Sequence, residues 1–252
     1  MVKLLLETPG VDINSKSTDK YKSGRTALSF AAEKGHEAVV KLLLAAPGVD
    51  ISSKSTGEYE SGRTALLFTT ENRHEAVIKL LLAAPGVDTN SKDSNGRTAL
   101  SFVAKDGHEA VVKLLLAAPG VDINSKDSNG QTALSLAAKK GHEAVVKLLL
   151  EAPGVDTNSE DSNGRTALSF AAKDGHEAVV KLLLAAPGVG INSKDSNGQT
   201  ALSLAAKKGH RVVVKLLLDE GADLESKDNN IQTLLSWASV NRHEAVVKLI
   251  LD

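Results

Sequence analysis

The feature that most constrains this chain is a motif that recurs along its whole length. Residues 93–126 return as residues 161–194 with only two substitutions. The spacing between copies is 34 residues in the middle of the chain, 38 at the start and 33 at the end. A glycine marks the same place in six copies, and isoleucine takes the seventh: Gly24, Gly62, Gly96, Gly130, Gly164, Gly198 and Ile231. Self-similarity at such a period predicts an array in which each repeat packs on its neighbours.

The first half of the motif predicts a turn followed by a short helix. Asn95 and Gly96 favour a turn because both tolerate positive φ. Thr98 is a candidate N-cap, since its hydroxyl can accept a free N–H of the first helical turn. Gly107 can take the left-handed conformation that ends a helix. Between these signals, three apolar residues lie on one helical face: Leu100, Val103 and Ala104.

The second half of the motif predicts another helix, which begins near His108. Its apolar residues cover much of the circumference, as expected for a helix that is packed on several sides. Glu109 and Lys113 form an i, i+4 pair in the favourable orientation. The dipeptide Pro119-Gly120 ends the helix, and all six prolines of the chain occupy this place. The segment after it predicts a projecting loop.

This pattern resembles the ankyrin repeat over the whole chain. The matching residues of one copy are Thr98, Leu100, Ala104, Gly107, His108, Val111, Leu114, Leu115, Gly120, Asp122 and Asn124. The resemblance implies an all-α ankyrin-repeat solenoid, a single domain over residues 1–252. It would comprise a half unit at 1–9 and seven helix-turn-helix units with projecting loops, which start near residues 24, 62, 96, 130, 164, 198 and 231.

Some positions depart from the family pattern. Thr69 and Thr70 replace the usual pair of alanines in the second unit. Arg73 and Arg242 replace the glycine between the helices, where a left-handed backbone would cost about 1–2 kcal/mol. We therefore expect these two units to be the less stable ones. Both ends of the chain are apolar, whereas terminal repeats normally carry a polar outer face, so we expect either a piece of a longer protein or ends that something else covers.

The repeats also carry a longer period. Residues 127–142 are identical to residues 195–210, which indicates duplication of a double unit of 68 residues. The first two units instead have a loop four residues longer, with Tyr21 and Tyr59 at equivalent places.

Composition excludes several classes of function. The chain has no cysteine, so disulfides and thiolate metal sites are impossible. No stretch approaches the roughly 18 apolar residues of a membrane span, so no membrane partner is expected. The net charge is −1, which does not favour nucleic acid. The sequence contains neither a recognisable signal peptide nor a glycosylation sequon, so we expect the protein in the cytoplasm, with the nucleus as the alternative. We also expect it to be a monomer.

The histidines and the polar loop residues recur in every repeat and are candidates for metal binding or catalysis. The seven histidines occupy one repeat position, and neighbouring copies would lie about 8–10 Å apart, too far to share a zinc ion. We expect them to bind loop backbone: His36, His74, His108, His142, His176, His210 and His243. The loops lack the residue order of a calcium loop, and no unique Ser/His/Asp set or phosphate-binding motif occurs. We expect no enzyme, no metal and no cofactor.

The remaining candidate is surface. The resemblance implies that a partner binds the loop tips and the exposed, concave side of the first helices. There the candidates are Arg97, Lys105, Asp106, Gln131, Lys139, Lys140, Arg165, Lys173, Asp174, Gln199, Lys207 and Lys208. Bases outnumber acids, which suits an acidic peptide or protein surface, although a solvated lysine-rich face would look the same. Tyr21, Tyr59 and Trp237 are further candidates, with packing between repeats as the alternative.

Two functions follow from the resemblance. One is a non-catalytic scaffold that binds a protein partner through the concave face. The other is the structural or sensor array of a larger receptor, since repeats this alike resemble those attached to NTPase-containing multidomain receptors of fungi. Recognition of an oligonucleotide or a phosphorylated ligand by the lysine-rich face is a weaker hypothesis, because only the two tyrosines could stack on bases and they lie outside the basic stretch.

Overall fold

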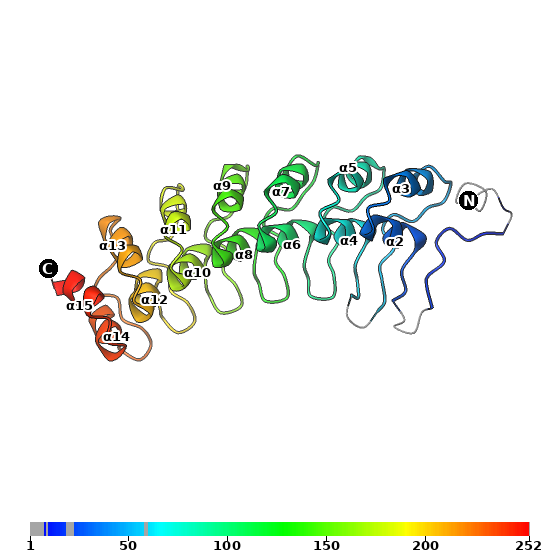
Figure 1. Cartoon of the computed structure of the whole chain (residues 1–252). Coiled ribbons are helices and arrows are strands. Elements are labelled where there is room, and N and C mark those ends of the chain that lie inside the picture. The colour runs from blue at the N-terminus through cyan, green and yellow to red at the C-terminus, as the bar shows by residue number, and fades with distance from the viewer. Residues whose placement is uncertain (1–7, 9, 19–22, 58–59, 252) are drawn as a thin grey trace. The chain divides into compact units, whose positions relative to one another are not determined.

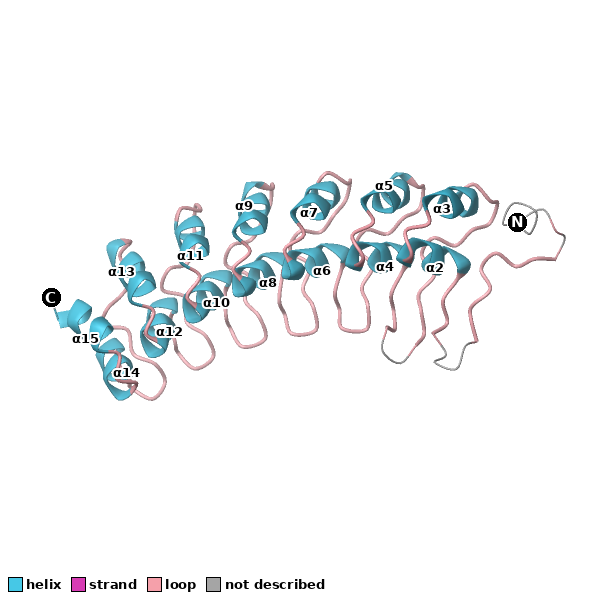
Figure 2. Cartoon of the chain, viewed as in Figure 1, coloured by secondary structure: helices cyan, strands magenta, loops and turns pink. Residues whose placement is uncertain are grey.

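The computed structural model describes residues 8, 10–18, 23–57 and 60–251. In this part of the chain, fourteen helices follow one another in seven pairs and no strand occurs (Figures 1 and 2). The helices divide between two compact units, each described by itself below. The first unit comprises residues 1–103 and 108–128, and the second comprises residues 104–107 and 129–252.

Each pair consists of a first helix and a second helix. The first helices are α2 (Ala27–Glu33), α4 (Ala65–Glu71), α6 (Ala99–Asp106), α8 (Ala133–Lys140), α10 (Ala167–Asp174), α12 (Ala201–Lys208) and α14 (Leu234–Val240). The second helices are α3 (Glu37–Leu44), α5 (Glu75–Ala83), α7 (Glu109–Leu116), α9 (Glu143–Glu151), α11 (Glu177–Leu184), α13 (Arg211–Asp219) and α15 (Glu244–Leu251). The predicted seven helix-turn-helix units are therefore confirmed, whereas most of the predicted half unit at 1–9 lies outside the described residues.

Local side-chain chemistry sets where the first helices begin and end. In α8 the Thr132 hydroxyl accepts the backbone N–H of Ser135, and the Ser135 hydroxyl bonds back to the Thr132 N–H. This reciprocal cap satisfies two N–H groups that a helix start leaves free. Gly141 then ends the helix with φ of 74°, in the left-handed region that glycine enters without steric cost. The predicted threonine cap and glycine stop are thus both present.

Within the described residues, three residues other than glycine also take a left-handed backbone. Arg73 has φ of 61° and Arg242 has φ of 60°, at the two places where arginine replaces the glycine between helices. Ile231, at the seventh turn position, has φ of 62° and is exposed. The sequence prediction of strained arginines is confirmed, and each such residue costs about 1–2 kcal/mol.

The core of each unit lies between helices of adjacent repeats. First helices pack in a row, as α8 on α10 and α10 on α12, and second helices pack in a parallel row, as α9 on α11. Ala137 and Ala138 of α8 are fully buried, and so are Val146 and Leu149 of α9. The small alanines let neighbouring first helices approach closely, while valine and leucine fill the space toward the second helices.

The loops are bonded both within a repeat and to the next repeat. Asp161 N–H donates to the Arg165 carbonyl at 3.0 Å, which closes each loop as a narrow turn. Ser196 N–H donates to the Asn163 carbonyl of the preceding repeat at 2.9 Å. In the segment after the second helix, the Asn158 side chain donates to the Gly188 carbonyl and accepts from the Gly190 N–H. This asparagine clasp recurs at Asn90 in the first unit.

Candidate basic edge on the first helices

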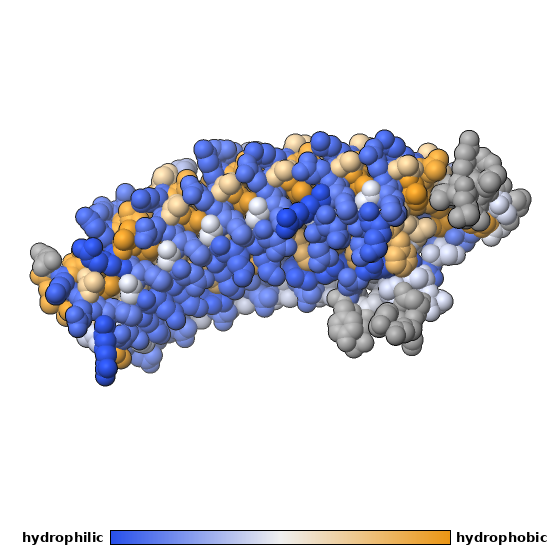
Figure 3. Space-filling view, viewed as in Figure 1, coloured by the Kyte–Doolittle hydropathy of each residue, from blue (hydrophilic) through white to orange (hydrophobic). Residues whose placement is uncertain are grey.

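Three positions of every repeat form the edge that the first helices and their loops present to solvent. The first position, at the end of the loop, holds arginine or glutamine, and the second, five residues later, holds an aromatic residue or leucine. The third lies three residues further on, in the last turn of the helix, and holds glutamate, lysine or, in the last repeat, valine. In the repeat of α10 they are Arg165, Phe170 and Lys173. We call the surface made by these positions the first-helix edge. Figure 3 shows that, in each unit, this side is mostly hydrophilic, while apolar side chains gather over the second helices.

In the first unit this edge is electrically neutralised. Arg25 is only 8% exposed and ion-pairs with Glu33 at 2.7 Å and with Glu60. Its guanidinium also lies over the Phe68 ring, 4.0 Å from the centroid. Arg63 is likewise buried and pairs with Glu71 at 2.6 Å. These arginines therefore have carboxylate partners and offer little positive charge to a ligand.

In the second unit the residue at the helix end changes from glutamate to lysine, and the edge becomes basic. Lys139 extends over the Phe170 ring, with its ammonium 5.2 Å from the centroid. Arg165 of the same repeat covers that ring at 4.7 Å. Lys207 lies over Trp237, at 3.8 Å. Such cation–π contacts orient the lysine side chains without removing their charge.

Arg165 is held by a carboxylate at the loop turn. Its Nε and Nη2 donate to Asp161 Oδ2 at 3.0 and 2.7 Å, and Asp161 Oδ1 accepts the backbone N–H groups of Asn163 and Arg165. Burial by itself raises the pKa of Asp161, but the hydrogen bonds from Arg165 and Asn163 and the arginine charge outweigh it, so this pKa is lowered. In the next repeat Asp195 has only the backbone bonds, because Gln199 replaces the arginine.

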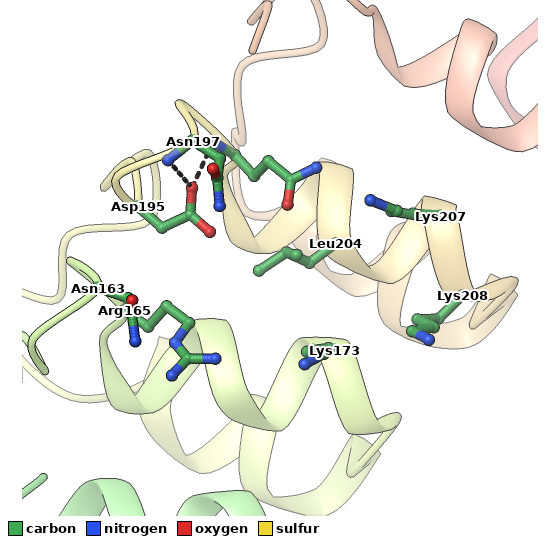
Figure 4. A pocket seen from close by; sticks show the side chains of 9 residues that line it. Asn163, Arg165, Lys173, Asp195, Asn197, Leu204, Lys207 and Lys208 are labelled. Atoms are coloured by element: carbon green, nitrogen blue, oxygen red, sulfur yellow. Dashed lines mark hydrogen bonds between the residues drawn. The ribbon is translucent and has the colours of Figure 1, made fainter. Parts of the chain in front are cut away.

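A hollow of about 310 Å³ opens in the first-helix edge between α10 and α12 (Figure 4). One wall carries Arg165 and Lys173 from the repeat of α10. The other wall carries the following residues: Asp195, Asn197, Gln199, Leu204, Lys207 and Lys208. Figure 4 shows the acid and amide groups near the loop and the lysines near the C-terminal ends of the two helices.

The structure places the predicted partner-binding residues in three groups. Lys140, Asp174 and Lys208 are exposed, as is Asp106. Half-buried positions hold Arg97, Lys105, Lys139, Arg165, Lys173, Lys207 and Trp237. Gln131 and Gln199 are 7% and 8% exposed, so they present little surface, although Gln199 lines the hollow. Tyr21 and Tyr59 lie outside the described residues.

Most of the repeated histidines have a structural bond, as predicted. In five repeats the imidazole Nε2 lies 2.9–3.1 Å from the carbonyl oxygen that ends the preceding first helix, as with His210 and Lys173. At His108 the Nε2 instead accepts from Arg73 Nε at 2.9 Å. Within the described residues no three His, Asp or Glu side chains are arranged to hold a metal ion.

The comparison with protein families decides what this repeat is. A family model described as ankyrin repeats, in three copies, matches residues 1–55, 48–127, 102–195 and 168–252. The chain belongs to the ankyrin repeat family.

A solved structure supports the same assignment of the ankyrin repeats. The crystal structure of the ankyrin repeat domain of Bcl-3, described as a unique member of the IkappaB protein family, aligns with a TM-score of 0.80 and 26% identity. The alignment covers 91% of this chain and 100% of that one. A comparison with curated protein sequences finds no match. Ankyrin repeat domains commonly serve as protein-interaction scaffolds.

Among the described ankyrin repeats, no helix is both long and apolar enough to cross a membrane. Sequence reasoning missed the glutamates that neutralise the first unit and the residues that open the hollow. The signal was present: Glu33 and Glu71 stand where later repeats have lysine, and Leu204 stands where Phe170 stands one repeat earlier. Comparing equivalent positions across repeats, rather than along one repeat, would have found both.

Proposed function

We propose that this ankyrin repeat domain binds a protein partner through the first-helix edge of its second unit, and that the partner presents an acidic surface or peptide. One observation carries the proposal. Five lysine ammonium groups on this edge or directly next to it have no ion-pair partner in the described part of the chain: Lys139, Lys140, Lys173, Lys207 and Lys208. In the first unit, ion-paired glutamates hold the places that correspond to Lys139, Lys173 and Lys207.

The contrast matters because the folded array does not need lysine at these places. Glu33 and Glu71 are the last residues of α2 and α4, at the place that Lys173 holds in the last turn of α10, so either residue type is compatible with the fold. Several unpaired like charges close together repel one another and raise the affinity of the surface for an oppositely charged ligand. Complementary charge also increases the association rate and favours one class of partner over others.

Charge reversal tests this proposal. The variant Lys139→Glu/Lys140→Glu/Lys207→Glu/Lys208→Glu reverses four charges on the edge. A matched control reverses four lysines of the second helices: Lys113, Lys147, Lys181 and Lys215. The probe is a fluorescent peptide of ten glutamates, followed by anisotropy against the full chain. We expect the edge variant to lose about fourfold to several hundredfold in affinity, since four exposed charge contacts of about 0.2–1 kcal/mol each sum to about 0.8–4 kcal/mol, whereas the control keeps most of the binding.

Equal losses in the two variants would mean that the peptide senses net charge and not the edge, and the proposal would then fail. The binding should also weaken as salt rises, because the contacts are exposed. The other hypothesis from the sequence, a sensor array of a larger NTPase-containing receptor, stays a prediction. Reading the coding sequence on both sides of these 252 codons tests it.

A further inference from the structure

Among the differences between two adjacent repeats, two exchange a large side chain for a smaller one beside the hollow between α10 and α12. In the repeat of α10, the Phe170 ring lies between the cations of Arg165 and Lys139, and these three side chains fill the equivalent space. In the next repeat Gln199 and Leu204 take the places of the arginine and the phenylalanine. The smaller side chains leave the hollow open, and the Lys173 ammonium has no aromatic ring beneath it.

The groups that line the hollow suit a negatively charged ligand. Lys173, Lys207 and Lys208 bring three ammonium groups to it. The only carboxylate among the lining residues is Asp195, whose Oδ1 already accepts two backbone N–H groups at 2.9 Å. The guanidinium of Arg165 is held by Asp161. Three ammonium groups against one free carboxylate leave the lining with a net positive charge, and the lysines lie toward the C-terminal ends of the helices.

The size of the hollow sets the size of the ligand. A volume of 310 Å³ corresponds to about ten water molecules at roughly 30 Å³ each. That is enough for one side chain ending in a carboxylate or a phosphate, together with a few waters. It is too small for a folded element. An extended peptide could therefore place one side chain in the hollow while its backbone stays on the edge.

We propose that this hollow is a specificity pocket that receives one anionic side chain of a protein partner, with Lys173 as the main contact and Lys208 beside it. The pocket deepens the function proposed above and rests on it. Lys207 contributes less, because its ammonium is already seated on Trp237. The hollow thus gives the second unit a place that recognises a single residue, in addition to the general attraction of the basic edge.

The sharpest test copies the filled repeat into the open one. The double variant Gln199→Arg/Leu204→Phe reproduces the pair Arg165/Phe170 at the next repeat, next to Asp195, which corresponds to Asp161. The chain already folds with this pair one repeat earlier, so the variant should fold. It adds a positive charge and removes the hollow. Net charge and the pocket therefore predict opposite changes in binding.

The assay is NMR titration of the isotope-labelled full chain with blocked pentapeptides. The central residue is glutamate, phosphoserine or glutamine, flanked by glycines. We expect the two anionic peptides to shift amide signals of α10 and α12, and the glutamine peptide to leave them unchanged. Comparing glutamate with phosphoserine shows which anionic group binds more tightly. The filled variant and Lys173→Gln should each weaken binding at least fivefold, while Lys181→Gln, a lysine of α11, should not.

The outcomes separate this pocket from the broader proposal. Unchanged or tighter binding of the anionic peptides to the filled variant would overturn the pocket. If the four-lysine reversal still abolished binding of the glutamate decapeptide, the basic edge would stand without it. If the four-lysine reversal left binding of the glutamate decapeptide unchanged, and the pocket variants left binding of the anionic pentapeptides unchanged, both the basic edge and the pocket would be overturned.

Discussion

Gly175 offers a test of how a repeat junction tolerates a single methyl group. It ends α10 with φ of 78°, and a Cβ built there would lie 2.6 Å from the His210 ring of the next repeat. That imidazole bonds the Lys173 carbonyl at 3.0 Å. Gly188 has a similar φ of 73°, but a Cβ there would meet nothing within 4 Å. The pair Gly175→Ala and Gly188→Ala therefore separates the cost of the backbone from the cost of the contact.

The magnitudes follow from these two environments. A left-handed alanine costs about 1–2 kcal/mol, and the stiffer unfolded chain offsets about 0.4–1 kcal/mol of this, so Gly188→Ala should destabilise by about 1 kcal/mol. Gly175→Ala must also move His210. Losing its hydrogen bond costs about 0.5–1.5 kcal/mol, and forcing the ring aside adds about 1–3 kcal/mol. Added to the backbone cost of about 1 kcal/mol, these terms predict that Gly175→Ala destabilises by about 2.5–5.5 kcal/mol.

The measurement combines urea unfolding, followed by far-ultraviolet circular dichroism, with amide hydrogen exchange. Exchange is needed because neighbouring repeats can open locally before the whole array unfolds. For Gly175→Ala the loss of protection should centre on α10 and α11. Equal effects of the two substitutions would show that the histidine contact does not resist the methyl group. Arg73 also takes a left-handed backbone at this repeat position, but its Nε donates a hydrogen bond to His108, which alanine cannot do. The presence of Arg73 therefore does not show that alanine would be tolerated.

Three further predictions concern single side chains. Asp161→Asn should destabilise by about 1.5–3 kcal/mol at pH 7 and more than Asp195→Asn, because charged hydrogen bonds are lost. Since the folded pKa of Asp161 is lowered, this advantage of the native chain is fully present above the unfolded pKa of about 3.9 and is lost as the pH falls from there through the folded pKa, so urea titrations should show a smaller difference at pH 3 than at pH 7. Arg242→Gly should raise the urea midpoint, because it relieves a φ of 60° worth about 1–2 kcal/mol against about 0.4–1 kcal/mol of added unfolded-state freedom; an unchanged or lower midpoint would contradict this. Asn158→Ala should cost about 1–3 kcal/mol by removing both bonds of the clasp, and thermal unfolding at matched concentrations checks it.

The fold could be predicted from sequence because its determinants are local and repeated. A threonine that caps a helix, a glycine that ends it and a proline that follows the next one act over a few residues. Because these signals recur at the same places of successive repeats, they predict one architecture, a row of helix pairs. The backbone of two exceptional residues could also be predicted, since Arg73 and Arg242 stand where the pattern requires a left-handed backbone, and both adopt it.

The candidate site was only partly predictable, because it depends on contacts between repeats. The sequence indicated the lysines of the edge but not which of them are committed to neighbours. Lys207 has Trp237 beneath it and Lys173 has Leu204, a difference that involves the next repeat. The burial of Gln199, which is only 8% exposed, was likewise not indicated by its polar character. A pattern read along one repeat cannot show either effect.

The asparagine clasp makes one repeat interchangeable with another as a neighbour. It bonds only to backbone groups, the carbonyl of Gly188 and the N–H of Gly190, and so does not depend on which side chains the neighbouring repeat carries. Deleting residues 127–194 would join Lys126 to a segment identical to the one it preceded. Recombination between copies can therefore lengthen or shorten the gene by 68 codons without creating an unfamiliar junction. Differences such as Leu204 for Phe170 would then be gained or lost as whole blocks.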